Sequence, residues 1–206
     1  MSDQPVPVRP GRKRSEESRL AILTAAFELA SEVGYAGLTI EGIAARSGAG
    51  KQTIYRWWPS KADVLLDALA VKADLHVPIP DEGDYTEDFR RFLTTSFALG
   101  RKQPVVDALR ALMAQAQMDA EFGERFRTEF LQRRRDALRI ILDRAHDRGD
   151  LPPGPSPDTI ADIVFGTIWY RLLATDRPLD KRLADELATM LAPPRPTSHS
   201  TRRTHA

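Results

Sequence analysis

The sequence predicts an all-α protein of about nine helices. Apolar residues recur at helical spacing along most of the chain, and no stretch shows the alternation of apolar and polar residues that marks a half-buried strand. Helix-stop signals divide these stretches, such as Gly149 followed by Pro152 and Pro153. We expect helices at about 15–33, 39–48, 50–57, 61–75, 85–100, 104–118, 119–147, 158–175 and 180–191.

The segment from Thr39 to Lys61 predicts two short helices joined by a tight turn and followed by the start of a third. Thr39 can cap the first helix, because its hydroxyl accepts a hydrogen bond from an exposed amide of the first turn. Gly48 closes that helix, since glycine tolerates the left-handed conformation of a helix end. Pro59 ends the second helix, and Ser60 caps the next one. This pattern is typical of a helix-turn-helix, whose second helix enters the major groove of DNA.

The second helix of this pair carries side chains suited to DNA. Gln52 can pair with an adenine edge, and Thr53 can touch a thymine methyl group. Ile54 is expected to face the small core of the motif, and Trp58 to pack inward. The alternative is a polar surface helix in a protein that binds no DNA. The residues suited to phosphate oxygens, which fix the register of a protein on the duplex, are Lys51, Tyr55, Arg56, Trp57 and Lys61.

Residues 15 to about 75 resemble the DNA-binding domain of the tetracycline-repressor (TetR) family of bacterial transcription regulators. The resemblance rests on the Gly34-Tyr35 corner, the helix starting at Thr39, the Tyr-rich run TIYRWW at 53–58, and the Ser60-Lys61 helix start. Gly50 departs from the family, in which Ser or Thr often begins the recognition helix, so a hydroxyl contact to phosphate is absent there. The resemblance implies DNA contacts from Thr39, Lys51, Gln52, Thr53, Tyr55, Arg56, Trp57 and Lys61.

The two helices expected near the C-terminus are strongly apolar. In TetR-like proteins the last two helices pair with their two-fold copies as a four-helix bundle, so the resemblance implies a homodimer that presents two recognition helices to a palindromic site. The alternative is that these faces complete the core of a single subunit. The residues expected at the dimer interface are Ile160, Val164, Ile168, Leu172, Leu183, Leu187 and Met190.

Residues 85–147 are expected to form an effector-binding core. An apolar pocket with few polar anchors suits a hydrophobic or aromatic small molecule. Aromatic residues at helical spacing are also ordinary core residues, and we expect about a third of the candidate wall residues to touch a ligand. The candidates for ligand binding are Phe89, Phe92, Phe97, Met113, Phe126, Phe130 and Trp169.

Charge is distributed unevenly along the chain, although the net charge is only +1. Residues 1–61 carry nine Lys or Arg and six Asp or Glu, and the last fourteen residues carry three Arg and no acid. Positive charge near the expected DNA-binding segment favours association with phosphates. We divide the chain into a disordered basic arm (1–14), a helix-turn-helix domain (15–60), an effector-binding and dimerisation domain (61–192) and a disordered tail (193–206). The arm either lies along DNA or only solubilises the chain.

Several classes of protein are disfavoured by composition. The chain has no cysteine and four scattered histidines, so we expect no metal site and no cofactor. No run approaches the ~20 apolar residues of a membrane span, so we expect a cytoplasmic protein. No catalytic motif is evident, so an enzyme is disfavoured. The sequence therefore predicts a ligand-responsive regulator, with a repressor favoured over an activator and a small-molecule effector over a protein partner.

Overall fold

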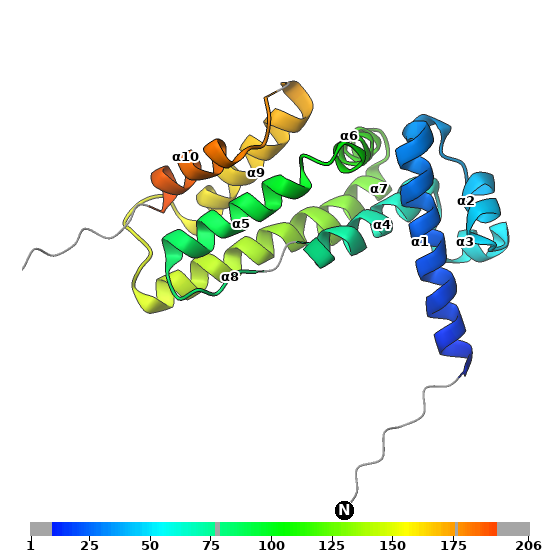
Figure 1. Cartoon of the computed structure of the whole chain (residues 1–206), viewed down its shortest axis with the longest axis horizontal. Coiled ribbons are helices and arrows are strands. Elements are labelled where there is room, and N and C mark those ends of the chain that lie inside the picture. Colours follow the sequence, from blue (N-terminus) through cyan, green and yellow to red (C-terminus); the bar gives the residue numbers. More distant parts are fainter. Residues whose placement is uncertain (1–9, 77–78, 176, 193–206) are drawn as a thin grey trace, which may run out of the picture. The chain divides into compact units, whose positions relative to one another are not determined.

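The computed structural model describes residues 10–76, 79–175 and 177–192, and over these residues it contains helices and connecting turns without strands (Figure 1). The all-α prediction is thereby confirmed. The helices form two compact units. The first unit comprises residues 1–77 and 99–133, and the second comprises residues 78–98 and 134–206.

The first unit begins with a long helix that is interrupted near its end. Helix α1 (Pro10–Gly37) contains Gly34 with φ 69° and ψ 172°, a conformation that only glycine adopts readily, so the chain turns at the predicted Gly34-Tyr35 corner. The helix starts five residues earlier than the expected Ser15. The prediction of a disordered arm is therefore wrong for the backbone of residues 10–14, while residues 1–9 and the tail from 193 lie outside the described residues.

Two short helices follow and lie beside α1 in Figure 1. Thr39 caps α2 (Ile40–Ser47) by accepting a hydrogen bond from the amide of Gly42 at 3.0 Å, and Gly48 ends it with φ 71°. Gly50 begins α3 (Lys51–Trp57) without a side-chain cap, as its sequence requires. Ile43 of α2 and Ile54 of α3 are both fully buried, and the two helices are in contact, so the predicted helix-turn-helix is formed.

The same unit includes α4 (Lys61–His76), α6 (Gln103–Met118) and α7 (Ala120–Arg125). The α4 residues Val64, Leu65 and Leu69 are almost fully buried, which fixes this helix against its neighbours. Helices α6 and α7 approach closely at Gly123, where a Cβ atom would lie 2.6 Å from the carbonyl oxygen of Ala116.

A π-helix, η1 (Phe126–Leu131), links α7 to α8 (Gln132–Arg148). The sequence predicts one continuous helix over 119–147, and helical structure does continue from 120, but its hydrogen bonding changes through η1. Periodicity could not show this, because a π-turn inserts about one extra residue and leaves the apolar spacing nearly intact.

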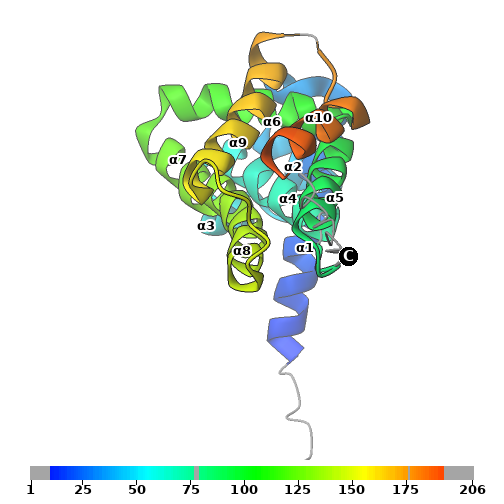
Figure 2. The same ribbon diagram turned by 90° about the vertical axis from the view of Figure 1, so that its left-hand side faces the viewer.

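The second unit contains α8 with α5 (Tyr85–Leu99), α9 (Pro157–Ala174) and α10 (Lys181–Leu191). Helices α9 and α10 lie side by side in Figures 1 and 2. The helix expected from about residue 158 begins at Pro157, so Asp158 lies in its first turn. Ser156 is the cap and accepts a hydrogen bond from the amide of Thr159 at 3.2 Å, because Pro157 occupies the first helical position.

An arginine and two buried carboxylates tie three helix ends of this unit together. Arg148, at the end of α8, contacts the carboxylates of Asp88 and Asp150 at 3.4 and 3.1 Å. Asp150 accepts from the backbone amide of Tyr85 at 3.2 Å, and the Tyr85 hydroxyl donates to the carbonyl of Leu191 at 3.2 Å. The start of α5 is therefore held to the ends of α8 and α10.

Candidate nucleic-acid interface

Helix α3 has one buried side and one polar, exposed side. Ile54 is fully buried, whereas Tyr55 is 54 % exposed. The side chains of Lys51, Gln52 and Arg56 are exposed as well, and Thr53 is partly exposed. Residues separated by four positions lie on one side of a helix, so Lys51 and Tyr55 are neighbours, as are Gln52 and Arg56. The exposed side thus offers two cations, an amide and a phenol.

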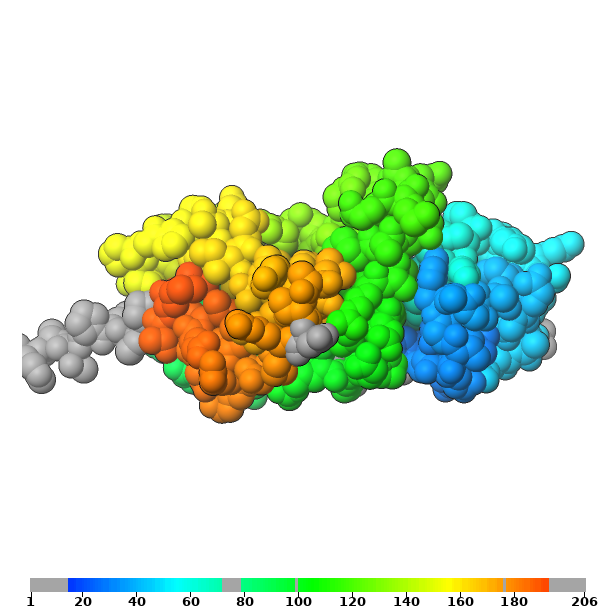
Figure 3. Space-filling view, turned by 90° about the horizontal axis from the view of Figure 1, so that it is seen from above, coloured from blue at the N-terminus to red at the C-terminus, as the bar shows by residue number. Residues whose placement is uncertain are grey.

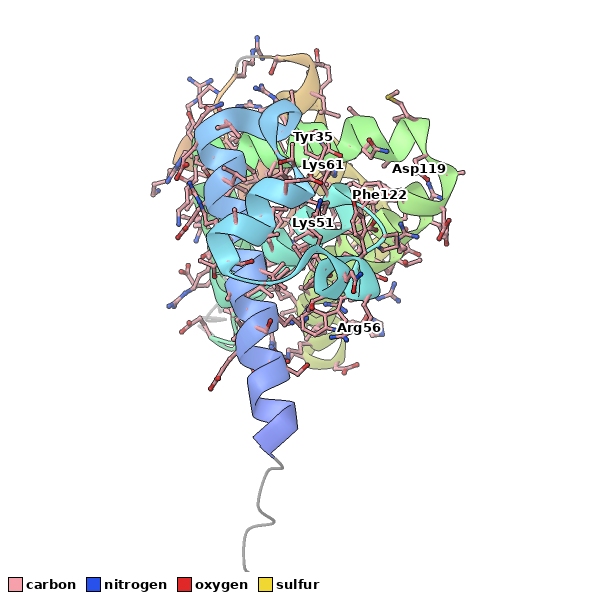
Figure 4. The ribbon with its side chains drawn as sticks, turned by 90° about the vertical axis from the view of Figure 1, so that its right-hand side faces the viewer. Tyr35, Lys51, Arg56, Lys61, Asp119 and Phe122 are labelled. Atoms are coloured by element: carbon pink, nitrogen blue, oxygen red, sulfur yellow. The ribbon has the colours of Figure 1, made fainter. Side chains whose placement is uncertain are left out.

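Lys51 lies at the start of α3 and Arg56 near its end (Figure 4). The Lys51 ammonium contacts the Glu41 carboxylate at 3.1 Å, and both side chains are more than half exposed. The pKa of Glu41 is lowered by a hydrogen bond with its own backbone and by that with Lys51. Exposed pairs of this kind contribute little to stability, so Lys51 can exchange Glu41 for a phosphate at little cost.

Tryptophan contacts anchor the C-terminal end of α3. The guanidinium carbon of Arg56 lies 5.5 Å from the centre of the Trp57 ring, and Trp57 meets Trp58 edge-on at 5.4 Å. Trp58 is only 4 % exposed, as expected for an inward-facing residue. Its indole N–H donates to Asp67 of α4 at 3.0 Å, and Asp67 also accepts from Arg19 of α1 at 2.9 Å. The end of α3 is therefore fixed to α4 directly and to α1 through Asp67.

Lys61 has a role that the sequence did not predict. Its ammonium donates to the carbonyl oxygens of Tyr35 and Leu38, both at 2.9 Å, and lies 4.5 Å from the centre of the Tyr35 ring (Figure 4). Two of its three N–H donors thus bind carbonyl oxygens at the C-terminal end of α1, and one is left for a phosphate. Tyr35 itself is partly buried, and burial first, then the charge of Asp63, raises its pKa.

Thr39 lies at the other end of the motif and is exposed. Its oxygen is occupied as an acceptor by the amide of Gly42, which leaves its O–H as a donor. The eight DNA-contact candidates thus come from the start of α2, from α3 and from the start of α4, within one unit.

The ligand-binding candidates are divided between the two units. Phe126 and Phe130 belong to the first unit, where Phe126 stacks on Phe122 and on Phe130 with ring centres 6.1 and 5.5 Å apart. Met113 of the first unit and Trp169 of the second are half-buried. Phe89, Phe92 and Phe97 are buried in the second unit. Their burial is what the alternative of ordinary core residues requires, and a role in ligand binding stays a prediction.

Most of the candidates for the dimer interface are buried within the chain itself. Ile160, Val164, Leu172, Leu183 and Leu187 have little exposed surface, which matches the alternative that they complete the subunit core. Ile168 is half-buried, and Met190 is 59 % exposed. Two large apolar residues of α9 that the sequence analysis did not select, Tyr170 and Leu173, are 64 % and 49 % exposed.

Neither a metal-binding cluster nor a membrane-spanning helix occurs in the part of the chain that the structure describes. No group of three or more His, Asp or Glu in this part of the chain is arranged to hold a metal ion. No helix in the same part combines the length and the apolar character needed to cross a membrane.

Comparison with known proteins identifies both parts of the chain. Residues 22–68 match the family described as "Bacterial regulatory proteins, tetR family", and residues 79–191 match "Tetracyclin repressor-like, C-terminal domain". The HTH-type transcriptional regulator YdeS of Bacillus subtilis is 34 % identical over 167 residues, which cover 80 % of this chain and 83 % of that protein.

Solved structures agree with this assignment. The TetR family transcription regulator SCO0332 is 31 % identical, with a TM-score of 0.75 over 87 % of this chain and 100 % of that one. The fold is also that of the regulator FadR from Bacillus subtilis in complex with stearoyl-CoA, with 20 % identity and a TM-score of 0.65 over 84 % and 97 % of the two chains. The chain belongs to the TetR family of DNA-binding transcriptional regulators.

Proposed function

We propose that this protein is a homodimeric repressor that binds a palindromic operator through α3 and is released by a hydrophobic or aromatic small molecule. The observation that carries the proposal is the exposed side of α3, on which Lys51, Gln52, Tyr55 and Arg56 stand opposite the buried Ile54. This side of the helix combines groups that bind phosphate with groups that read bases.

Each side chain has a role in this proposal. Gln52 reads an adenine edge, and Thr53 contacts a thymine methyl group in the major groove. The residues that position the helix on the phosphates are Thr39, Lys51, Tyr55, Arg56, Trp57 and, through its remaining donor, Lys61.

The exposed apolar side chains of α9 and α10 support the dimer. Tyr170 and Leu173 of α9 and Met190 of α10 lack cover in the single chain, and Figure 3 shows α9 and α10 at the surface of the second unit. We place these three residues at a two-fold interface. A two-fold dimer carries two copies of α3, which fit half-sites about 34–36 Å apart.

The proposed effector is a hydrophobic or aromatic small molecule. The chain carries many apolar aromatic side chains, and the similar fold of FadR from Bacillus subtilis was solved with stearoyl-CoA. Both support a hydrophobic ligand for this cytoplasmic regulator. The competing candidate is regulation by a protein partner. A rise in melting temperature with members of a panel of acyl-CoA thioesters and aromatic compounds would favour the small molecule.

The DNA-binding part is tested by selection from randomised duplexes. The purified protein is incubated with the duplexes at one moderate salt concentration, and the retained DNA is sequenced over several rounds. We expect an inverted repeat. Retention without any enriched motif, both with and without the compound panel, would contradict sequence-specific binding.

A further inference from the structure

Asp63 joins the DNA-binding motif to α7. It lies in the first turn of α4, and only 6 % of its surface is exposed. One carboxylate oxygen accepts hydrogen bonds from the backbone amide and the hydroxyl of Ser60, at 3.0 and 2.7 Å. The other oxygen accepts from two nitrogens of Arg125, at 2.8 and 2.7 Å. A single carboxylate thus caps α4 and binds a side chain 62 residues further along the chain.

The first turn of α4 is a junction for the whole motif. It follows α3 after only three residues, which include Pro59. Lys61 of this turn holds the carbonyls of Tyr35 and Leu38, and one turn later Asp67 binds the Trp58 indole. A displacement of this turn therefore reaches the recognition helix α3 through short, direct contacts.

Arg125, the partner of Asp63, lies where α7 meets η1. It is the last residue of α7 and immediately precedes the π-helix η1. In the sequence it lies between Phe122 and Phe126, whose side chains are both 1 % exposed and stack on each other. Figure 4 labels Phe122 on α7. The placement of Arg125 is thus set by a buried aromatic stack and by a π-turn, an irregularity that often occurs at functional sites.

Burial separates this ion pair from the others in the unit. Pairs such as Arg127–Glu124 lie between side chains that are both more than half exposed, and they contribute little. Asp63 is shielded from water, so removal of Arg125 leaves a buried carboxylate without this cation, supported by the hydrogen bonds from Ser60, and the neighbouring groups must rearrange. The orientation of the first turn of α4 therefore depends on Arg125.

We propose that Arg125 is a positioning residue for DNA binding, which holds α3 in its DNA-binding orientation through Asp63 and the first turn of α4. The proposal rests on the proposed function, since it concerns the same interface. Because Arg125 lies between Phe122 and Phe126 in the sequence, a change in the packing of these two side chains would act on the DNA-binding interface through Arg125.

The test compares Arg125→Gln with Arg127→Gln, which removes an exposed pair two residues away and leaves Asp63 untouched. Affinity is measured by fluorescence anisotropy for the selected operator and for a scrambled duplex. We expect Arg125→Gln to weaken operator binding by about tenfold and to change scrambled-duplex binding much less. Arg127→Gln should bind like wild type, and Arg125→Lys, which keeps one charged contact, should fall between them.

A second readout needs no DNA. The chain has three tryptophans, so incorporation of 5-fluorotryptophan gives three ¹⁹F NMR resonances. In Arg125→Gln we expect the resonances of Trp57 and Trp58 to shift while that of Trp169, in the other unit, stays in place. Movement of all three would indicate general loss of structure and contradict a positioning role.

The two readouts also separate the inference from the proposed function. If wild type binds its operator and Arg125→Gln binds it equally well, the inference is wrong and the proposed function stands. If wild type prefers no sequence, the proposed function fails, and unchanged Trp57 and Trp58 resonances would then overturn the structural coupling as well.

Discussion

At the scale of single residues, Lys51 and Gln52 are adjacent on α3 but are expected to act differently. Lys51→Ala removes a phosphate contact, so it should weaken binding to all duplexes and lower the salt slope, log Kobs against log salt, by about one. Gln52→Ala should keep that slope and lose preference at one base position of each half-site. Anisotropy titrations at several salt concentrations, with repeated selection, measure both. An unchanged motif with Gln52→Ala would count against Gln52 as a reader.

Tyr85 makes stability depend on pH in the alkaline range. Burial, followed by the charge of Asp150, raises its pKa above the ordinary value. The folded chain therefore keeps the phenol proton above about pH 10, where the unfolded chain releases it. Because the unfolded state then binds fewer protons, the free energy of unfolding falls as the pH rises.

The substitution Tyr85→Phe removes this titration. It should destabilise the chain by about 1 kcal/mol at neutral pH, through loss of the hydrogen bond to the Leu191 carbonyl, and reduce the alkaline decline. Urea unfolding between about pH 8 and about pH 11 compares the free energies of unfolding of the two proteins. The control is Tyr55→Phe, because the Tyr55 side chain is half-exposed. Equal declines in wild type and Tyr85→Phe would contradict the account.

At the scale of helices, the close approach of α6 and α7 depends on Gly123. A Cβ atom there would lie 2.6 Å from the Ala116 carbonyl oxygen, so Gly123→Ala must push the two helices apart. We expect a loss of about 1–3 kcal/mol in the free energy of unfolding, measured by urea denaturation. Gly166→Ala is the control, since a Cβ atom on that α9 residue meets nothing within 4 Å. Equal stabilities of the two variants would show that the contact can relax.

Local signals explain why the sequence predicted most helix boundaries. Thr39, Gly48 and Ser60 act through hydrogen bonds or backbone conformations within a few residues, so their effect can be read from spacing alone. The partners of Asp63 and Asp67 could not be predicted, because Arg125 and Arg19 lie 62 and 48 residues away. Nothing in the local sequence distinguishes these two arginines from exposed ones.

In the candidate site, too, local features could be predicted from the sequence and long-range contacts could not. The exposed side of α3 follows from helical periodicity, which places Ile54 opposite Gln52 and Arg56. The role of Lys61 in holding the Tyr35 and Leu38 carbonyls depends on where the chain turns at Gly34, and this emerges only in three dimensions.

At the scale of the whole molecule, the proposed dimer brings two DNA-binding motifs together. Leu173→Glu places a charge among exposed apolar side chains of α9, so it should convert dimers into monomers and weaken operator binding about a hundredfold or more, because each half-site then binds alone. Sedimentation equilibrium measures the first effect and anisotropy the second. Ile140→Glu, at a 39 % exposed residue of α8, should leave both unchanged. If the Leu173→Glu variant stayed dimeric, the dimer interface would not include this part of α9.

The central claim, that α3 of each subunit lies in the major groove, can be tested directly because the chain has no cysteine. Gly50 precedes α3 with an ordinary φ of −70°, and a Cβ atom there meets only the Thr53 hydroxyl at 4.0 Å, so Gly50→Cys should fold normally and accept an iron chelate. On the selected operator, the tethered iron should cleave two clusters of bases centred in the major groove, symmetric about the repeat and about one helical turn apart. Cleavage spread evenly along the duplex, or confined to one side of the repeat, would contradict the account.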